Sequence, residues 1–524
     1  SLPYYTGGVV ESSEDLIMMF PEDFKAKHNI DVYTQTEVLK INRAEKKITV
    51  KDLKNGETRN EAYDKLVLAT GTEPVMPGSI EGIHSPHVFT IRNVVDIERL
   101  QAKLDEESTK NIAVVGGGFI GVEVAENLRK IGKEVTLIEG TKQILAPYDY
   151  DMVQILHKEL DDNGITLHVS ATVTAIESKQ VKAVKDGKEF TVAADAVVMA
   201  VGARPKTELA KDAGLEIGTT GGIWVDHNYR TSDADIYAVG DAIESYNMLA
   251  HAPGRIALAG PAQRQARAAA DHICGMYNTN KGYIGSSCIK VFGQNAACTG
   301  LNEREAKRLG YSYDSVMIFP MDRVGLMPGA NYMVFKLVFE IPTGRILGAQ
   351  AIGTGECDKR VDVIATMITM GGRLEDLKEL ELCYAPPFST AKDVVNLAAL
   401  VALNVLNGRI KQVHVDKVRE LVEQGAYIID VRGAGELKTG HLKGAHHIPL
   451  NELRDRLDEI PRDIPVYLHC RSSQRSYYAT CTLIENGFTN VYNISGSFLG
   501  ISLYEYFNDK TQGREPIVTQ YNFE

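Results

Sequence analysis

A single cysteine, Cys470, stands where the apolar stretch PVYLHC meets a polar loop that carries Arg471 and Arg475. A thiol is a poor nucleophile, whereas a thiolate attacks readily. The N–H groups of the loop, the start of a helix expected near Ser476 and the two guanidinium groups would all favour an anion at this sulfur. These residue types therefore predict a reactive thiolate in a positively charged cradle.

The spacing between the cysteine and the second arginine indicates which anion the loop suits. Cysteine phosphatases use the pattern Cys-x5-Arg, a loop sized for phosphate. Here Arg475 follows Cys470 after one residue fewer. The shorter loop favours a persulfide or a thiosulfate-like ion over a phosphate ester.

The segment IIDVRGAGELKTGHLKGAHHIP, residues 428–449, leads toward this cysteine. It has a strand ending in Asp430-Val431-Arg432, followed by Gly440-His441, Gly444-Ala445 and Ile448-Pro449. Residues 411–524 resemble one rhodanese domain along nearly their full length. The resemblance implies that Cys470 carries sulfane sulfur as a persulfide, with Arg471 and Arg475 beside it. The alternative is a noncatalytic rhodanese-like fold, in which the cysteine is often replaced.

Three histidines of this region are expected to have structural roles. His469 precedes the cysteine at the end of an apolar strand, which favours a buried strand residue over a base. His446 and His447 have no third ligand at a suitable spacing, so we predict no metal site.

A dinucleotide fingerprint lies far upstream, in VVGGGFIGVE. Gly116-x-Gly118-x-x-Gly121 directly follows an apolar strand and opens a helix, and Glu139 ends the next strand. Glycines let the backbone approach a pyrophosphate, and the helix N-terminus supplies free N–H groups. A carboxylate at Glu139 would accept from a ribose 2′-hydroxyl and repel a 2′-phosphate. The pattern predicts NADH, and Lys142 nearby leaves NADPH as an alternative.

Three further segments end apolar strands at a glycine: LATGTEP (68–74), AVGARP (200–205) and YAVGDA (237–242). Together they resemble the two-dinucleotide-binding flavoprotein family, whose members carry FAD and NAD(P)H on two similar domains. The resemblance implies that Asp241 contacts the ribityl chain of FAD. The other cofactor-binding positions that it implies are Ala69, Thr70, Gly71, Gly202, Gly240 and Ala385.

The first residues, SLPYYTGGV, resemble the segment that follows the active cysteine in coenzyme A disulfide reductases. We expect the FAD fingerprint and the redox cysteine to lie before Ser1, the alternative being a chain that never had this half. In YAPPFSTAKDVVN (384–396), the resemblance implies that Tyr384 reaches the active site of the other subunit of a homodimer. A tyrosine that the family often places before Pro-Gly is Met327 here, preceded by Leu326. Coenzyme A disulfide is therefore not singled out as substrate.

These motifs predict an α/β chain of several domains. We expect two Rossmann-like dinucleotide-binding domains, the first incomplete at its N-terminus, an α+β dimerisation domain and a C-terminal rhodanese domain. The expected ranges are 1–105 and 226–282 for the FAD domain, 106–225 for NAD(P)H, 283–405 for dimerisation and 411–524 for rhodanese. The stretch NGRIKQVHV (407–415) reads as a linker.

Composition and net charge limit the kinds of binding partner and the cellular compartment that we expect. The chain has 524 residues and a formal net charge of −12, which argues against nucleic acid and anionic membranes. It contains no apolar stretch long enough to cross a bilayer. Its seven cysteines show no paired spacing, which favours a reducing cytoplasm over a disulfide scaffold.

The two halves together predict an oxidoreductase that uses FAD and NADH or NADPH. It would reduce a persulfide, a polysulfide or coenzyme A disulfide, with coenzyme A as a further ligand, next to a sulfur-carrying rhodanese domain. The alternatives are an NADH oxidase or peroxidase, and a nonreductive sulfurtransferase on a dimer scaffold.

Overall fold

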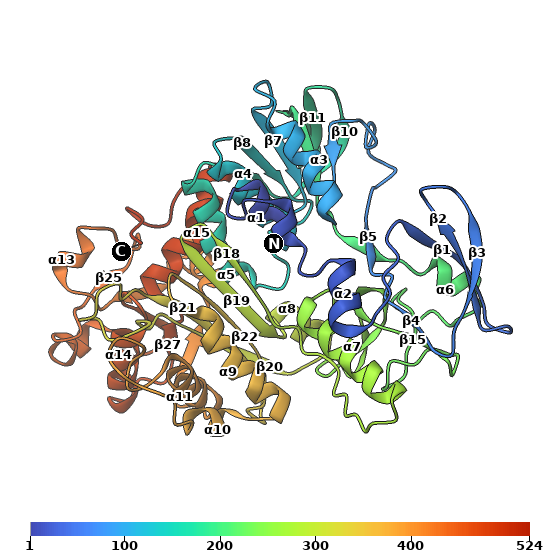
Figure 1. Cartoon of the computed structure of the whole chain (residues 1–524). Helices are drawn as coiled ribbons and strands as arrows, with labels where there is room; N and C mark the ends of the chain where they lie inside the picture. The colour runs from blue at the N-terminus through green and yellow to red at the C-terminus, as the bar shows by residue number, and fades with distance from the viewer. Residues whose placement is uncertain (1, 524) are drawn as a thin grey trace. The chain divides into compact units, whose positions relative to one another are not determined.

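The computed structural model describes residues 2–523, which form two compact units (Figure 1). The first unit comprises residues up to 142 together with 168–284, and the second comprises 143–167 together with 285–524. The segment 143–167, which lies inside the range expected for the NAD(P)H domain, belongs to the second unit. The reason is α5 (Tyr150–Asp162), whose buried side chains pack on α15 (Ser497–Gln512).

In the first unit, a parallel sheet carries the glycine fingerprint. Strands β6 (Val88–Phe89), β13 (Ala196–Met199), β7 (Asn111–Val115) and β8 (Glu134–Ile138) lie side by side in that order. Strand β7 is apolar and buried because sheet neighbours and helix α4 (Phe119–Lys130) cover it. The predicted strand, helix and strand over 111–138 are confirmed.

The strand-to-glycine segments also pair with one another in this unit. The apolar strand that leads into LATGTEP is short: only β4 (Leu66–Leu68) pairs there, in parallel with β15 (Ile236–Ala238). The chain turns at Gly71, and β5 (Thr72–Pro74) then pairs antiparallel with β14 (Ala203–Pro205). The motifs LATGTEP and AVGARP therefore lie against each other. A separate antiparallel sheet contains β1 (Thr36–Asn42), β2 (Lys47–Asp52) and β3 (Thr58–Ala62).

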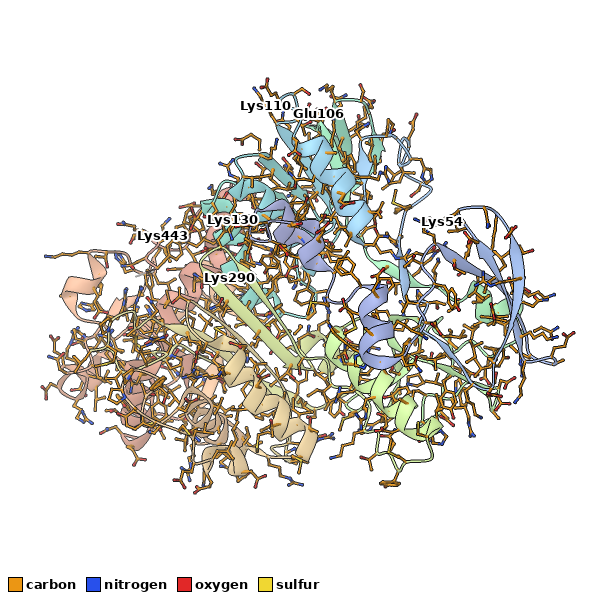
Figure 2. The ribbon with its side chains drawn as sticks, viewed as in Figure 1. Lys54, Glu106, Lys110, Lys130, Lys290 and Lys443 are labelled. Carbon is orange, nitrogen blue, oxygen red and sulfur yellow. The ribbon has the colours of Figure 1, made fainter. Side chains whose placement is uncertain are left out.

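The second unit contains an antiparallel sheet and a parallel sheet. The antiparallel strands, in spatial order, are β18 (Ser287–Val291), β19 (Gln294–Gly300), β22 (Ile346–Gly353), β21 (Met333–Glu340) and β20 (Tyr313–Ile318). Helices α9 (Cys357–Met370) and α11 (Val394–Leu406) pack on this sheet, which buries β21 and β22 almost completely. Charged side chains such as Lys290 on β18 and Lys443 project outward (Figure 2).

The parallel sheet holds the cysteine. Its strands, in spatial order, are β23 (Lys411–Val413), β27 (Val491–Ile494), β26 (Val466–His469), β24 (Tyr427–Asp430) and β25 (His446–His447). All their pairings are parallel. The linker interpretation of 407–415 is wrong in part, because β23 is an edge strand of this sheet. The sequence signal was weak, since an edge strand needs only one partner and two of these three residues are polar.

Among residues 2–523, no helix is both long and apolar enough to cross a membrane.

Candidate functional site

Cys470 follows the last residue of β26, at the carboxyl end of the parallel sheet, and α14 (Gln474–Glu485) begins four residues later. The cysteine is 1% exposed, so its sulfur lies at the base of the loop. Its N–H donates to Ser497 Oγ at 3.1 Å, and its carbonyl accepts from the Phe498 N–H at 3.1 Å. The first two residues of α15 therefore fix the Cys470 backbone through two hydrogen bonds.

Two hydroxyl groups approach the sulfur. Ser476 Oγ lies 3.6 Å and Ser497 Oγ 3.9 Å from Cys470 Sγ, both within hydrogen-bonding range for sulfur. Both serines are fully buried. A thiolate or persulfide here would accept from hydroxyl donors that are already in place. Sequence reasoning missed both serines as ligands of the sulfur, and Ser497 lies too far along the chain for a local pattern to reveal it.

The two arginines differ in what they contact. Arg475 donates from both terminal nitrogens to Glu436, with both N···O distances at 2.7 Å. Its pKa is raised, first by the hydrogen bonds to Glu436 and further by the sulfur of Cys470. Arg471 Nη1 donates to the carbonyl of Asn522 at 3.2 Å, and burial lowers the pKa of Arg471. Glu436 therefore offsets part of the positive charge that the sequence predicted around the sulfur.

A buried polar layer underlies the loop. Arg432 donates to the Asp430 carboxylate at 2.7–3.0 Å and to the Gly440 carbonyl at 2.9 Å, and its guanidinium lies 4.2 Å from the Phe498 ring centroid. His469 is completely buried, as predicted, and burial lowers its pKa. Its imidazole is therefore neutral near pH 7.

The other two histidines of this region are held by neighbours. His446 stacks on Tyr427 with ring centroids 4.0 Å apart, and His447 Nε2 lies 2.8 Å from the Arg432 carbonyl.

In the first unit, the glycine fingerprint has the geometry that nucleotide binding needs. Gly116 has φ +108°, and a Cβ there would lie 2.3 Å from the Ala200 carbonyl oxygen. A Cβ at Gly121 would lie 1.9 Å from the Gly116 oxygen, so the helix can start this close to the strand only with glycine. At Gly118 a Cβ would meet nothing within 4 Å. The first and last glycines thus serve packing, and the middle one leaves open space for a ligand.

Glu139 lies beside this loop. Its carboxylate accepts from the Gly117 N–H at 2.6 Å and from the Thr141 N–H at 2.7 Å. Each carboxylate oxygen keeps a further lone pair for a ribose hydroxyl. The residues present therefore fit an NAD(H) adenosine half.

The expected flavin positions other than Ala385 belong to the first unit. Thr70 Oγ1 donates to the Lys206 carbonyl at 2.7 Å, and the Gly240 N–H donates to Gln265 Oε1 at 2.7 Å. Burial raises the pKa of Asp241. A cavity of about 520 Å³ lies beside β4 and is lined by residues that include Leu68, Ala69 and Thr70. Asp241 does not line this cavity. A half-buried carboxylate at the end of a strand can accept from a hydroxyl group of a cofactor.

Tyr384 and Ala385 belong to the second unit. Tyr384 is 49% exposed, and the Ala385 carbonyl accepts from the Phe388 and Ser389 N–H groups. The Val324 N–H donates to the Pro386 carbonyl at 3.3 Å, so the loop with Leu326 and Met327 runs beside the tyrosine segment. Phe388 and Leu326 are both strongly exposed. The structure thus brings together the Tyr384 segment, which the resemblance connects with the partner subunit, and the segment in which the family often has a second tyrosine.

Three family models match the chain. Residues 6–266 match the pyridine nucleotide-disulphide oxidoreductase model, residues 286–394 its dimerisation domain, and residues 414–503 the rhodanese-like domain. The fold and motifs thus define a two-part chain, a pyridine nucleotide-disulphide oxidoreductase part followed by a rhodanese-like domain.

Several known proteins are similar to this chain over most of its length. The reduced CoADR-RHD of Bacillus anthracis is 42% identical with a TM-score of 0.92, covering 97% of this chain and 91% of that one. A NAD-dependent persulfide reductase from A. fulgidus is 36% identical with a TM-score of 0.89, covering 95% and 91%. A coenzyme A disulfide reductase of Staphylococcus epidermidis is 31% identical over 76% of this chain and 89% of its own length. A Methanocaldococcus jannaschii NADH oxidase is 34% identical over 78% and 91%.

The chain belongs to the pyridine nucleotide-disulphide oxidoreductase family, in the form that carries a C-terminal rhodanese domain. That family implies FAD and NAD(P)H as cofactors, and the residues described above fit both.

Proposed function

We propose that this protein reduces sulfane sulfur compounds with electrons from NADH, and that Cys470 delivers the sulfur. The observation that carries the proposal is the complete sulfur site at Cys470, with its hydroxyl donors and the Arg475–Glu436 pair, on a chain with a dinucleotide fingerprint. The similarity to a persulfide reductase along 95% of the chain supports it. The substrate class is a persulfide, a polysulfide or coenzyme A disulfide.

The sulfur step follows from the geometry at Cys470. The thiolate attacks the outer sulfur of the donor, a new S–S bond forms, and the donor's own bond to that sulfur breaks. The donor residue leaves with the electron pair, as sulfite does from thiosulfate. Ser476 and the loop amides stabilise the anionic persulfide that results. Arg475, which Glu436 holds in place, attracts the anionic donor.

The reductive step needs two electrons and two protons, which convert a persulfide RSSH into a thiol RSH and hydrogen sulfide. When bound, FAD passes the two electrons of a nicotinamide hydride to sulfur. For this chain we propose Asp241, Gly240 and residues 69–71 as its contacts, together with Gly202 and Ala385, the two further positions that the resemblance implies. Gly116, Gly118 and Gly121 would hold NADH, and Glu139 would disfavour the 2′-phosphate of NADPH.

We further propose a homodimer, in which the exposed Tyr384 faces the partner's reductase site. Coenzyme A would serve as substrate or as the carrier thiol. The seven cysteines are all free, which supports a reducing compartment such as the cytoplasm.

The test compares the protein with Cys470→Ser. We expect the variant to lose sulfur transfer from thiosulfate by at least about a thousandfold, because its nucleophile is gone. NADH oxidation by preformed coenzyme A persulfide should continue. Cys481→Ser, on helix α14, is the matched control. Undiminished thiosulfate consumption by Cys470→Ser would refute the role of Cys470.

The second candidate is an NADH oxidase, which the similarity to the M. jannaschii oxidase favours. Stopped-flow reoxidation of the NADH-reduced protein separates the two candidates. A faster reaction with persulfide than with oxygen supports the reductase, and the reverse order supports the oxidase.

A further inference from the structure

Ser497 is held in a conformation that serine seldom adopts. It is the first residue of α15, it is fully buried, and its φ is +48°. A side chain in this left-handed region costs conformational energy, which glycine avoids. Gly496, immediately before it, also has a positive φ of +86°. The backbone turn at residues 496 and 497 would therefore be more stable with glycine at residue 497 as well.

Helix capping does not explain the serine. The cap position of α15 is Gly496, and no side chain makes the capping hydrogen bond. The Ser497 hydroxyl points instead toward the sulfur loop. It accepts from the Cys470 N–H at 3.1 Å and lies 3.9 Å from Cys470 Sγ. Strain that persists at a buried polar residue points to a role for that side chain.

The remaining contacts of the hydroxyl define what its proton can do. Ser473 Oγ lies 3.2 Å away and Ser476 Oγ 3.4 Å away, and the Ile494 carbonyl accepts at 3.3 Å. The Ser497 proton thus has three possible acceptors in reach: the Ile494 carbonyl, Ser476 Oγ and the Cys470 sulfur. An anionic sulfur is the strongest acceptor of the three.

We propose that Ser497 is a catalytic residue of the sulfur site, a second hydroxyl that donates to the sulfur of Cys470 together with Ser476. This inference rests on the proposed function of Cys470 as sulfur carrier. The hydroxyl keeps its proton throughout: it stabilises the thiolate before attack and the same sulfur atom after the S–S bond has formed. The Ser497 hydroxyl also accepts a hydrogen bond from the Cys470 N–H, and this bond fixes the orientation of Cys470.

The experiment separates the hydroxyl from the backbone strain. Ser497→Gly removes both, and Ser497→Ala removes only the hydroxyl. We expect both variants to shift the acid limb of kcat/KM for thiosulfate upward by about 0.5 to 1 pH unit, and to lower the rate at pH 6 by roughly three- to tenfold. The glycine variant should keep or raise its Tm, and the alanine variant should not.

The matched control is Ser170→Gly, an exposed serine with φ +54° in the first unit. It should leave the pH profile unchanged. If Ser497→Gly and Ser497→Ala both keep the wild-type pH profile, Ser497 is not a donor to the sulfur. The proposed function fails separately, through sulfur transfer that survives Cys470→Ser.

Discussion

At the scale of single residues, the surroundings of the reactive sulfur are balanced rather than uniformly positive. Arg475 is paired with Glu436, and Arg432 beneath the loop is paired with Asp430. The hydrogen bonds from Arg475 are also the largest cause of the lowered pKa of Glu436. In the proposed sulfur site, oriented hydrogen-bond donors would therefore contribute more than excess positive charge.

This balance predicts the outcome of a double-mutant cycle. Arg475→Ala leaves the Glu436 carboxylate without its main partner near the sulfur, so the thiolate is disfavoured. We expect kcat/KM for thiosulfate to fall about tenfold or more. Arg475→Ala combined with Glu436→Ala should recover part of that loss, because the opposing charge is gone. A double variant no faster than the single one would contradict this account.

At the scale of elements, one buried ammonium joins three segments of the second unit. Lys336 on β21 lies 2.8 Å from Asp151, 2.7 Å from Glu303 and 3.2 Å from Asp149. Burial would lower the pKa of Lys336, but the three carboxylates outweigh it and raise that pKa well above its usual value. The carboxylates are close enough to one another for a metal ion, and the lysine ammonium fills their centre.

Replacing Lys336 should strongly lower the stability of the fold. Lys336→Met removes the compensating charge and leaves buried carboxylates facing one another. We expect a loss of about 3–5 kcal/mol in the free energy of unfolding, measured with urea. The control is Lys290→Met on β18, an exposed lysine of the same sheet that should change stability by less than about 0.5 kcal/mol (Figure 2). Equal effects of the two substitutions would contradict the role of the cluster.

At the scale of the whole molecule, the second unit holds the sulfur-carrier sheet against the antiparallel sheet. Gln412 donates to the Ser315 carbonyl at 2.7 Å, and His414 Nε2 lies 3.4 Å from the Asp314 carboxylate. Tyr150 of α5 also donates to Asn508 of α15 at 2.8 Å. These contacts connect the rhodanese-like domain to other segments of the second unit.

The His414 contact makes this docking dependent on pH. Burial lowers the pKa of His414, but the hydrogen bond to Asp314 and the charge of Glu303 outweigh it, so the net shift is upward. A raised histidine pKa stabilises the fold fully below the unfolded value near 6.5 and loses that effect as pH rises through the folded value. The side chain is 32% exposed, so screening limits the effect to below about 1 kcal/mol.

We therefore expect the His414→Gln variant to have a lower Tm than the unsubstituted protein at pH 6. At pH 8.5 the two Tm values should lie closer together. Thermal unfolding followed at both pH values measures the difference. A Tm gap that widens with rising pH would show that the neutral imidazole, and not the charged one, makes the contact.

Much of the fold could be read from local patterns. The strand, fingerprint and helix over 111–138 follow from periodicity and glycine spacing, and the sulfur loop follows from one apolar strand that ends at Cys470. The edge strand β23 could not be predicted, because its stability comes from β27 about 80 residues later. The same holds for α5, whose assignment to the second unit depends on packing against α15.

The sequence by itself determined the chemistry: a thiol between arginines, a dinucleotide loop, and the family to which both belong. Only the tertiary structure decided how that thiol is held. Glu436 opposite Arg475 and Ser497 beneath Cys470 come from distant segments, and hydrogen bonds act only over a few ångströms. No local pattern can reveal which residues the fold brings within that range.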